Sequence, residues 1–353
     1  MLYLTRALQL FTSIIAAWCA VTIGLNFNVE AAAPGREAGS HKRWTLDTPL
    51  PDRKYEVAAV RDSTGTIYVF GRDQRVEAFD PATHVWNSRA PLPVKSGLSG
   101  LPTVTAGPDG KIYATGSDLN WSSSAGARAF EAYDPSTNRW AERAPIPTGR
   151  SGATAVTGKD GKIYVLGGFI PDPGDNSNRL FRRSIDVYNP RTNSWQVKAA
   201  MPTAREGLGA SVGPDGKIYA IGGGTDHFDR FFRCFATVEA YDPTTDSWSR
   251  KLSLPTQMCD VTAGLTSNGT IVAVGGATVE GGEQGPHITP ATGRVLSFKP
   301  GSSRWTVLSR TPIPRKQAGG VVDPKGTVYV IGGEDRFDHP TATVQACRSC
   351  GAG

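Results

Sequence analysis

Residues 161–168, Gly-Lys-Ile-Tyr-Val-Leu-Gly-Gly, place a short apolar run between glycines. Runs rich in branched and aromatic residues between turn formers are typical of β-strands. Further along, Tyr188 precedes Trp195 by seven residues, and an Asn-Pro step between them favours a turn. This stretch therefore predicts four strands, at residues 151–157, 162–166, 184–188 and 194–198.

The same pattern recurs along the whole chain. An apolar pair stands before a glycine six times, and these glycines are Gly71, Gly116, Gly167, Gly222, Gly275 and Gly332. In five units an aromatic residue then precedes a tryptophan by seven residues, in the pairs Phe79/Trp86, Tyr133/Trp140, Tyr188/Trp195, Tyr241/Trp248 and Phe298/Trp305. Six units that agree in several independent offsets indicate a repeat architecture.

This pattern resembles the kelch repeat from residue 41 to about residue 347. The resemblance implies an all-β fold, a six-bladed kelch-type β-propeller with four-stranded blades around a channel. The sixth unit lacks its last strand, because Cys347 stands at the aromatic position and no tryptophan follows. Residues 41–51, which contain Trp44, match the missing strand. We therefore predict that the last blade is closed by an N-terminal strand, which leaves no unpaired edge, and that residues 348–353 form a tail.

The first residues predict a targeting segment. Residues 1–33 carry one basic residue, Arg6, followed by a long apolar stretch, as in a signal peptide or an N-terminal membrane anchor. A Val-x-Ala pattern ending at Ala31 favours cleavage, and residues 34–40 would form a linker. Either way we expect the propeller to be secreted, periplasmic or on the cell surface. Four cysteines follow this segment, which permits disulfides there. They are Cys234, Cys259, Cys347 and Cys350.

Charge and composition predict few partners. The net charge of +6 is modest, and no long basic run or RNA-binding motif is present. We therefore expect no nucleic-acid partner, membrane contact only through the possible N-terminal anchor, no cofactor and a monomer.

One repeat position predicts a ligand site. Counting back seventeen residues from each glycine reaches the start of the channel-lining strand, at Lys54, Ser99, Arg150, Arg205, Met258 and Arg315. Four of these are basic, so we predict an electropositive channel mouth. In similar animal kelch adaptors, arginines in Arg-Ser-Gly positions bind acidic peptides, and Arg150-Ser151-Gly152 matches that pattern. Arg205 and Arg315 match only in the arginine. The alternative is that these arginines pair with neighbours such as Glu206 or Glu334.

The long loops hold further candidates. His227, Asp229, His287 and His339 are expected on one face, with the acidic neighbour Asp335. Because no short His-x-His spacing is present, the sequence predicts polar loops and no metal site.

Function is predicted as binding rather than catalysis. Copper radical oxidases need an adjacent Tyr-His pair, which is absent here. Periplasmic sialic acid mutarotases are a closer analogy, so a sugar-active enzyme using Glu206, Glu334 or Asp335 as acid or base is the alternative. The first expectation is a binding module for an anionic peptide, protein or glycan at the channel mouth.

Overall fold

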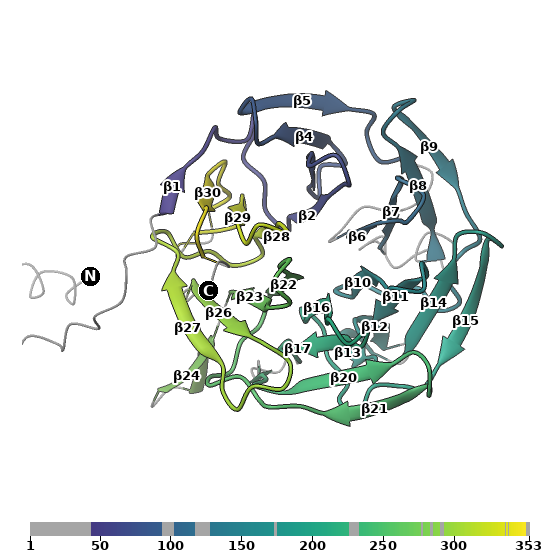
Figure 1. Cartoon of the computed structure of the whole chain (residues 1–353), viewed down its shortest axis with the longest axis vertical. Coiled ribbons are helices and arrows are strands. Elements are labelled where there is room, and N and C mark those ends of the chain that lie inside the picture. The colour runs from purple at the N-terminus through teal and green to yellow at the C-terminus, as the bar shows by residue number, and fades with distance from the viewer. Residues whose placement is uncertain are drawn as a thin grey trace, which may run out of the picture. The chain divides into compact units, whose positions relative to one another are not determined.

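The computed structural model describes residues 44–93, 102–116, 128–172, 175–225, 233–276, 278–282, 285–289, 293–335, 337 and 339–350. Residues 41–353 form one compact unit, in which six four-stranded antiparallel sheets surround a centre (Figure 1). The predicted targeting segment at 1–33 and the linker at 34–40 lie outside the described residues. Within the described ranges, no helix is long and apolar enough to cross a membrane.

Each of the first five blades follows chain order from the channel to the rim. The first holds β2 (Ala58–Arg61), β3 (Ile67–Phe70), β4 (Val76–Asp80) and β5 (Val85–Arg89). The second holds β6 (Thr103–Ala106), β7 (Ile112–Thr115), β8 (Phe130–Asp134) and β9 (Arg139–Glu142). The third holds β10 (Thr154–Thr157), β11 (Ile163–Leu166), β14 (Ile185–Asn189) and β15 (Ser194–Lys198).

The fourth blade holds β16 (Gly209–Val212), β17 (Ile218–Ile221), β20 (Val238–Asp242) and β21 (Ser247–Arg250). The fifth holds β22 (Val261–Leu265), β23 (Ile271–Gly275), β26 (Arg294–Phe298) and β27 (Thr306–Arg310). The sixth holds β28 (Gly319–Val322), β29 (Val328–Ile331), β30 (Val344–Cys347) and β1 (Trp44–Leu46). The four strands predicted for the third unit are therefore confirmed.

In the described part of the chain, three blades carry an extra two-stranded hairpin between their second and third strands, where the sequence predicted only long loops. These hairpins are β12 (Phe169–Asp172) with β13 (Asp175–Phe181), β18 (Gly224–Thr225) with β19 (Arg233–Cys234), and β24 (Thr278–Gly282) with β25 (Gly285–Thr289). They belong to blades three, four and five. Because the second strand of a blade ends on the face where the first begins, these hairpins lie on that face. Those of blades three and four reach the entrance to the channel, where Phe169, Arg179 and Gly224 line a cavity.

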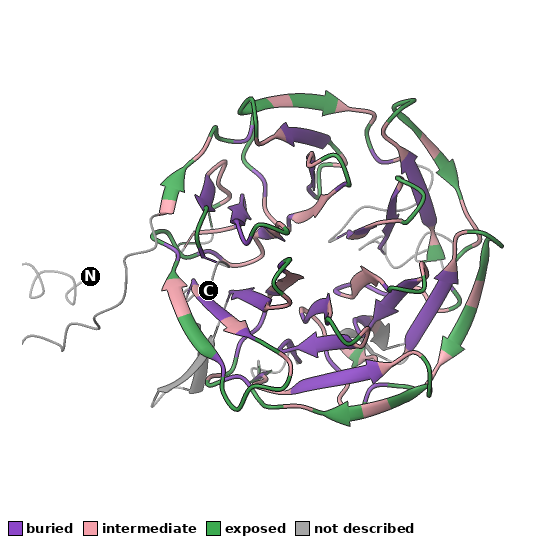
Figure 2. Ribbon diagram, in the orientation of Figure 1, coloured by how far each residue is buried: buried purple, intermediate pink, exposed green. Residues whose placement is uncertain are grey.

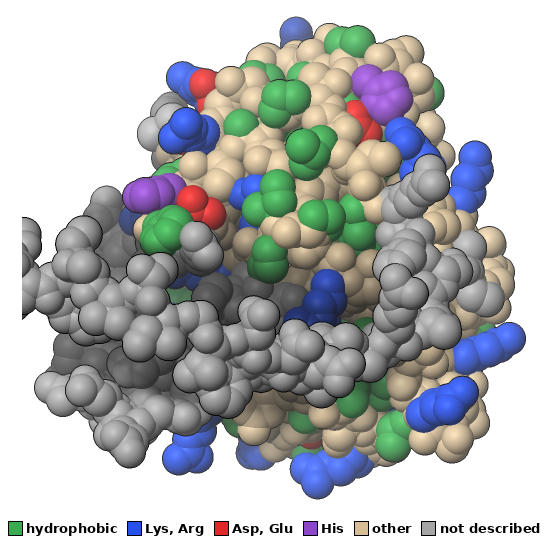
Figure 3. All heavy atoms as spheres, turned by 90° about the vertical axis from the view of Figure 1, so that its left-hand side faces the viewer, with side chains coloured by type: hydrophobic (Ala, Val, Ile, Leu, Met, Phe, Trp, Pro, Cys, Tyr) green, Lys and Arg blue, Asp and Glu red, His purple; other side chains and the backbone are tan. Residues whose placement is uncertain are grey.

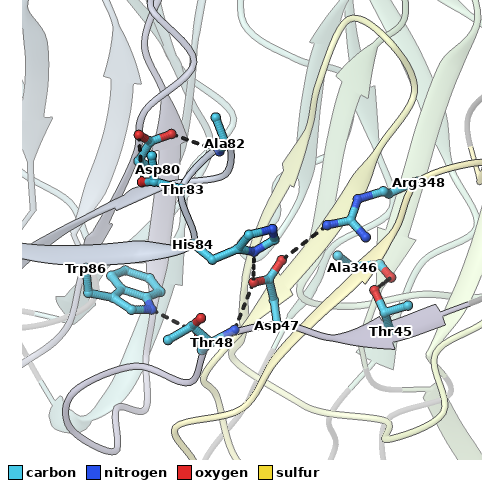
Figure 4. Close-up of polar contacts among 10 residues, drawn as sticks. All are labelled: Thr45, Asp47, Thr48, Asp80, Ala82, Thr83, His84, Trp86, Ala346 and Arg348. Carbon is cyan, nitrogen blue, oxygen red and sulfur yellow. Dashed lines mark hydrogen bonds and ion pairs between the residues drawn. The ribbon is translucent and has the colours of Figure 1, made fainter.

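The predicted closure of the ring is confirmed. Strand β1 pairs with β30, with Trp44 opposite Cys347. Figure 4 shows this seam, where the Asp47 carboxylate lies 2.5 Å from His84 Nδ1 and 3.8 Å from Arg348 Nη2. Cys347 takes the place of the aromatic residue of the other blades. Its disulfide with Cys350 lies in the apolar cluster to which the Trp44 ring also belongs.

The periodic tryptophans join neighbouring blades. The Trp195 indole N–H donates to the Ala144 carbonyl of the preceding blade at 2.7 Å, and its ring packs on Tyr188. Asn193 lies in the tight turn between these two rings with φ 50°. Its side-chain oxygen accepts the Ala144 N–H and the Tyr188 hydroxyl. The seven-residue spacing therefore corresponds to a hairpin whose turn and indole ring both form hydrogen bonds with the preceding blade.

Burial follows the position of a strand between channel and rim. The second and third strands of the blades are almost entirely buried, while the outermost strands are largely exposed (Figure 2). Each blade is covered on both faces by its neighbours, so strands such as β11 are apolar throughout. On the side that carries the seam, Lys and Arg side chains are spread singly over the surface (Figure 3).

Candidate functional site: the mouth of the channel

The channel mouth is formed where the chain enters each innermost strand. In the five blades whose entry is described, one residue there has a left-handed backbone. These residues are Glu56, Gly152, Gly207, Asp260 and Gln317, with φ between 50° and 63°. The turn lets each main chain bond across to the next blade, as when Val261 N–H donates to the Gly207 carbonyl at 3.0 Å. A left-handed conformation costs a residue other than glycine about 1 kcal/mol.

A cavity of about 400 Å³ lies at this mouth. Blades three, four, five, six and one supply its charged lining, and small residues of the innermost strands supply most of the rest. The charged side chains are Glu56, Arg179, Glu206, Asp260 and Lys316. A volume of this size is in the range that holds a small ligand or part of a peptide. Among the described residues of this lining, the carboxylates outnumber the bases.

Two ion pairs hold the bases at the mouth. Arg179 Nη1 lies 3.2 Å from Glu206 Oε1, and its guanidinium lies 4.3 Å from the centre of the Phe169 ring. Across the mouth, Lys316 Nζ lies 3.4 Å from Glu334 Oε2. All four charged side chains are partly accessible to solvent, with 15% to 24% of their surface exposed. The two pairs can therefore exchange partners with a ligand.

The remaining carboxylates at the mouth are harder to ionise than usual. Burial in the channel raises the pKa of Asp260 to about 6, against the opposing effects of the Gln317 N–H and Lys316. Burial also raises the pKa of Glu56, and the nearby Glu334 adds to this, while Arg72 opposes it. A carboxyl group that titrates near pH 6 can change its charge within the physiological range.

The four predicted basic residues lie inside the blades instead of around the mouth. Arg150 is buried against Asp186, and Arg205 Nη2 lies 3.0 Å from Glu239. Lys54 is buried and donates to Asp73 at 2.8 Å, and Arg315 donates to Thr341. Their direct contact with a ligand stays a prediction.

The backbone explains this placement. At the repeat position that Arg150, Arg205 and Arg315 occupy, the main chain is held against the preceding blade. For example, the Gly168 N–H donates to the Arg205 carbonyl at 2.9 Å. The left-handed residue two positions later redirects the chain into the channel. Burial lowers the pKa of Arg150 to about 10 and also lowers that of Arg205, although Glu239 opposes the latter shift.

The other candidates divide between the mouth, the rim of the loops and the parts that are not described. Glu206 lines the mouth, and Glu334 contacts it through Lys316. His339 is exposed, 3.6 Å from Asp335. His227 and Asp229 lie outside the described residues, and His287 falls in β25. In the part of the chain that the structure describes, no three His, Cys, Asp or Glu residues could hold a metal ion.

Sequence reasoning missed the residues that line the mouth. These residues stand two positions after the start of the channel-lining strand that the sequence predicted. They are Glu56, Asp260 and Gln317, with Gly152 and Gly207 at the same place in other units. Residues that tolerate a left-handed backbone at one repeat position are a signal that could have found them. The disulfide between Cys234 and Cys259 was not predicted as a pair, and it ties β19 to the residue before Asp260.

Known proteins share this architecture. Residues 100–333 match the model of the KLHDC2/KLHL20/DRC7 Kelch-repeats domain. The chain is 27% identical over 320 residues to Kelch-like protein 35 of Mus musculus, which covers 88% of this chain and 47% of that protein. It is 28% identical over 232 residues to Kelch-like protein 40 of Xenopus tropicalis, covering 66% of this chain and 35% of that protein. The chain thus spans less than half the length of these curated relatives.

A solved structure shares the fold. It is titled "Structure of YjhT" and superposes with a TM-score of 0.67 at 17% identity, covering 84% of this chain and 95% of that chain. Together, the matched domain model, the repeat offsets and the six closed blades show that this chain belongs to the kelch-repeat family.

Proposed function

We propose that the propeller is an interaction module that binds an acidic segment of a partner protein at the channel mouth. One observation supports this most: the mouth holds two bases, Arg179 and Lys316, each paired with a carboxylate of the chain itself. Glu206 and Glu334 then act as internal substitutes for the ligand. The membership in a family of interaction modules supports a protein partner.

Binding is an exchange of ion pairs. A partner carboxylate displaces Glu206 from Arg179, whose planar fork suits a bidentate contact, while the Phe169 ring keeps the guanidinium in place. Asp260 opposes an anion when it is ionised. Because its pKa is raised to about 6, it becomes neutral as the pH falls below that value. The acidic segment should therefore bind more tightly at pH 5.5 than at pH 7.5.

The test uses polyglutamate as the probe and isothermal titration as the measurement. Arg179→Met and Lys316→Met should each weaken binding about tenfold or more, since each removes a charge-assisted contact. Glu206→Gln should strengthen binding, because it removes the competing carboxylate. Arg310→Met, on the exposed rim, is the charge-matched control. Equal affinity of Arg179→Met and wild type would overturn the proposal.

A sugar-active enzyme is the second candidate, and Asp260 is the observation that favours it. A carboxyl group with a pKa of about 6 beside Lys316 is suited to proton transfer, and the cavity is large enough for one sugar ring. Anomer exchange of an acidic sugar, followed by NMR, would be abolished in Asp260→Asn. No exchange by the wild type across acidic sugars would remove this candidate.

We also propose that the propeller works outside the cytoplasm. Two disulfides, Cys234–Cys259 and Cys347–Cys350, support this, because such bonds persist in oxidising compartments. Amino-terminal sequencing of the protein from its host should begin after residue 31 if the predicted leader is cleaved. An unprocessed terminus in the cytosolic fraction would contradict this location.

A further inference from the structure

Three arginines share one repeat position but differ in what faces them. Arg150, Arg205 and Arg315 each stand seventeen residues before the glycine of their unit. Each of these units has a second position, two residues before its aromatic site. That position holds Asp186 in the unit of Arg150, Glu239 in the unit of Arg205 and Gln345 in the unit of Arg315. Arg150 and Arg205 therefore bury their charge against a carboxylate of their own blade. In the unit of Arg315, that position holds a neutral amide.

Gln345 gives Arg315 no compensating charge. Its amide is engaged with Ile313, accepting from that N–H at 3.0 Å and donating to that carbonyl at 2.7 Å. The carboxylate with an electrostatic effect on Arg315 is that of Asp335, which accepts the N–H groups of Phe337 and His339. Among the described residues, no carboxylate oxygen lies within 4.0 Å of the Arg315 guanidinium.

Arg315 is nevertheless buried. Its residue surface is 5% exposed, and its Nε has no hydrogen-bond partner among the described atoms. Burial lowers its pKa, which shows that the surrounding protein disfavours the charged form. Leaving a buried charge without a counter-ion is strongly destabilising. A group that supplies negative charge at Nε would relieve this cost.

A small recess beside Arg315 has the right size and donors for such a group. It lies between blades five and six, has a volume of about 20 Å³ and is also lined by Asp260, whose carboxyl group opposes an anion while it is ionised. Thr311 also lines it, and its buried hydroxyl oxygen has no partner among the described atoms. Gly293 leaves room at this hydroxyl, because a Cβ there would overlap with the Thr311 oxygen. The recess accommodates one water-sized group.

We infer that this recess binds a single monatomic anion, chloride in ordinary media, between the Nε–H of Arg315 and the hydroxyl of Thr311. A water molecule would satisfy the two donors but would place no negative charge in direct contact with the guanidinium. Space for about one water-sized group suits a monatomic anion better than sulfate or phosphate. The anion takes the part that Asp186 and Glu239 play in blades three and four. The inference does not depend on the binding of a partner at Arg179 and Lys316.

Bromide is the probe for the direct test. Crystals of the mature protein grown in sodium bromide should give an anomalous peak within hydrogen-bond distance of Arg315 Nε and Thr311 Oγ1. An anomalous map without a peak in the recess, or with only surface peaks, would overturn the inference. Crystals of Arg315→Met should show no peak at this place.

Thermal unfolding in chloride and gluconate at equal ionic strength provides the second test. Chloride at a hundred times its dissociation constant should raise Tm by about 4 °C relative to gluconate. Arg315→Met should abolish this difference, and it should fold because methionine stands at the same position in blade five, as Met258. Thr311→Val should reduce the difference without removing the charge.

The rim variant Arg310→Met is the control, since it makes the same change of charge at an exposed site. It should keep the full chloride effect. A chloride effect that persists in Arg315→Met, or that gluconate reproduces, would contradict the inference. Neither result would bear on the proposed function, which polyglutamate binding tests at other residues.

Discussion

Blades four and five place different kinds of residue at the same pair of buried repeat positions. Blade four places Arg205 and Glu239 there, as a fully buried ion pair with a separation of 3.0 Å. Blade five places Met258 and Leu296 at the same two repeat positions, within one apolar cluster. Both blades pair their strands in the same register. The fold therefore accepts a matched charged pair or a matched apolar pair, and the requirement is that the two residues match.

Blades two and six show the two unmatched cases. Blade two has a carboxylate, Glu131, at the repeat position of Glu239, but it has Ser99 at the repeat position of Arg205. Burial raises the pKa of Glu131 to about 7, with a further contribution from Glu142. Blade six retains the base, Arg315, opposite Gln345. An unmatched acid can take up a proton, whereas an arginine cannot readily lose one, so the second case calls for an external anion.

The largest expected effect on stability comes from removing one partner of the buried ion pair in blade four. Glu239→Leu leaves Arg205 buried without a partner and should lower the free energy of unfolding by about 3–5 kcal/mol. The double variant Arg205→Met with Glu239→Leu copies blade five and should recover most of this loss, because a buried ion pair is often replaceable by apolar residues of similar size. Urea unfolding of the wild type, both single variants and the double variant measures the coupling. A double variant as unstable as Glu239→Leu would break the comparison.

A smaller effect is expected from the acid of blade two, and it depends on pH. The folded pKa of Glu131 is about 7 and the ordinary value is 4.5, so the folded state favours the protonated carboxyl. The stability it contributes is complete below pH 4.5 and is lost as the pH rises through 7. Glu131→Gln should therefore gain about 2–3 kcal/mol over wild type between pH 4.5 and pH 8.

Unfolding in urea at several pH values measures this difference. Glu142→Gln is a second comparison, because Glu142 is an exposed carboxylate opposite Glu131 on strand β9 and adds to the raised pKa of Glu131. It should reduce the pH dependence in part, because burial, the larger cause, remains. A pH dependence that is the same in Glu131→Gln and wild type would show that Glu131 is ionised in the folded protein.

The smallest expected effect on stability comes from a threonine that lies beside the buried pair in blades four and five. The Thr203 hydroxyl donates to Glu239 at 2.8 Å, and the equivalent residue in blade five, Thr256, stands where Leu296 replaces the acid. Thr203→Val should cost about 1.5 kcal/mol through the lost bond to a charged group. Thr256→Val should change stability by less than about 0.5 kcal/mol. Equal costs in urea unfolding would show that Thr203 contributes nothing to the ion pair.

Much of the fold was predictable because the repeat is periodic in sequence. The offset between Tyr188 and Trp195 predicted a hairpin, and Trp44 predicted the closing strand, since local turn chemistry and strand period act over a few residues. The candidate site was less accessible. Arg150 and Arg205 were predicted at the mouth from a correct strand position, but the direction of their side chains was not in the pattern.

The sequence by itself determined the number of blades, the order of the strands and the strand that closes the ring. Only the tertiary structure decided which residues face the channel. A single left-handed residue, such as Asp260, turns the chain at the entry to the innermost strand, and a shift of one position along a strand changes the face to which a side chain points. Which arginine finds a carboxylate, and which meets Gln345, depends on contacts between segments more than twenty residues apart, and such contacts form only when the blade folds.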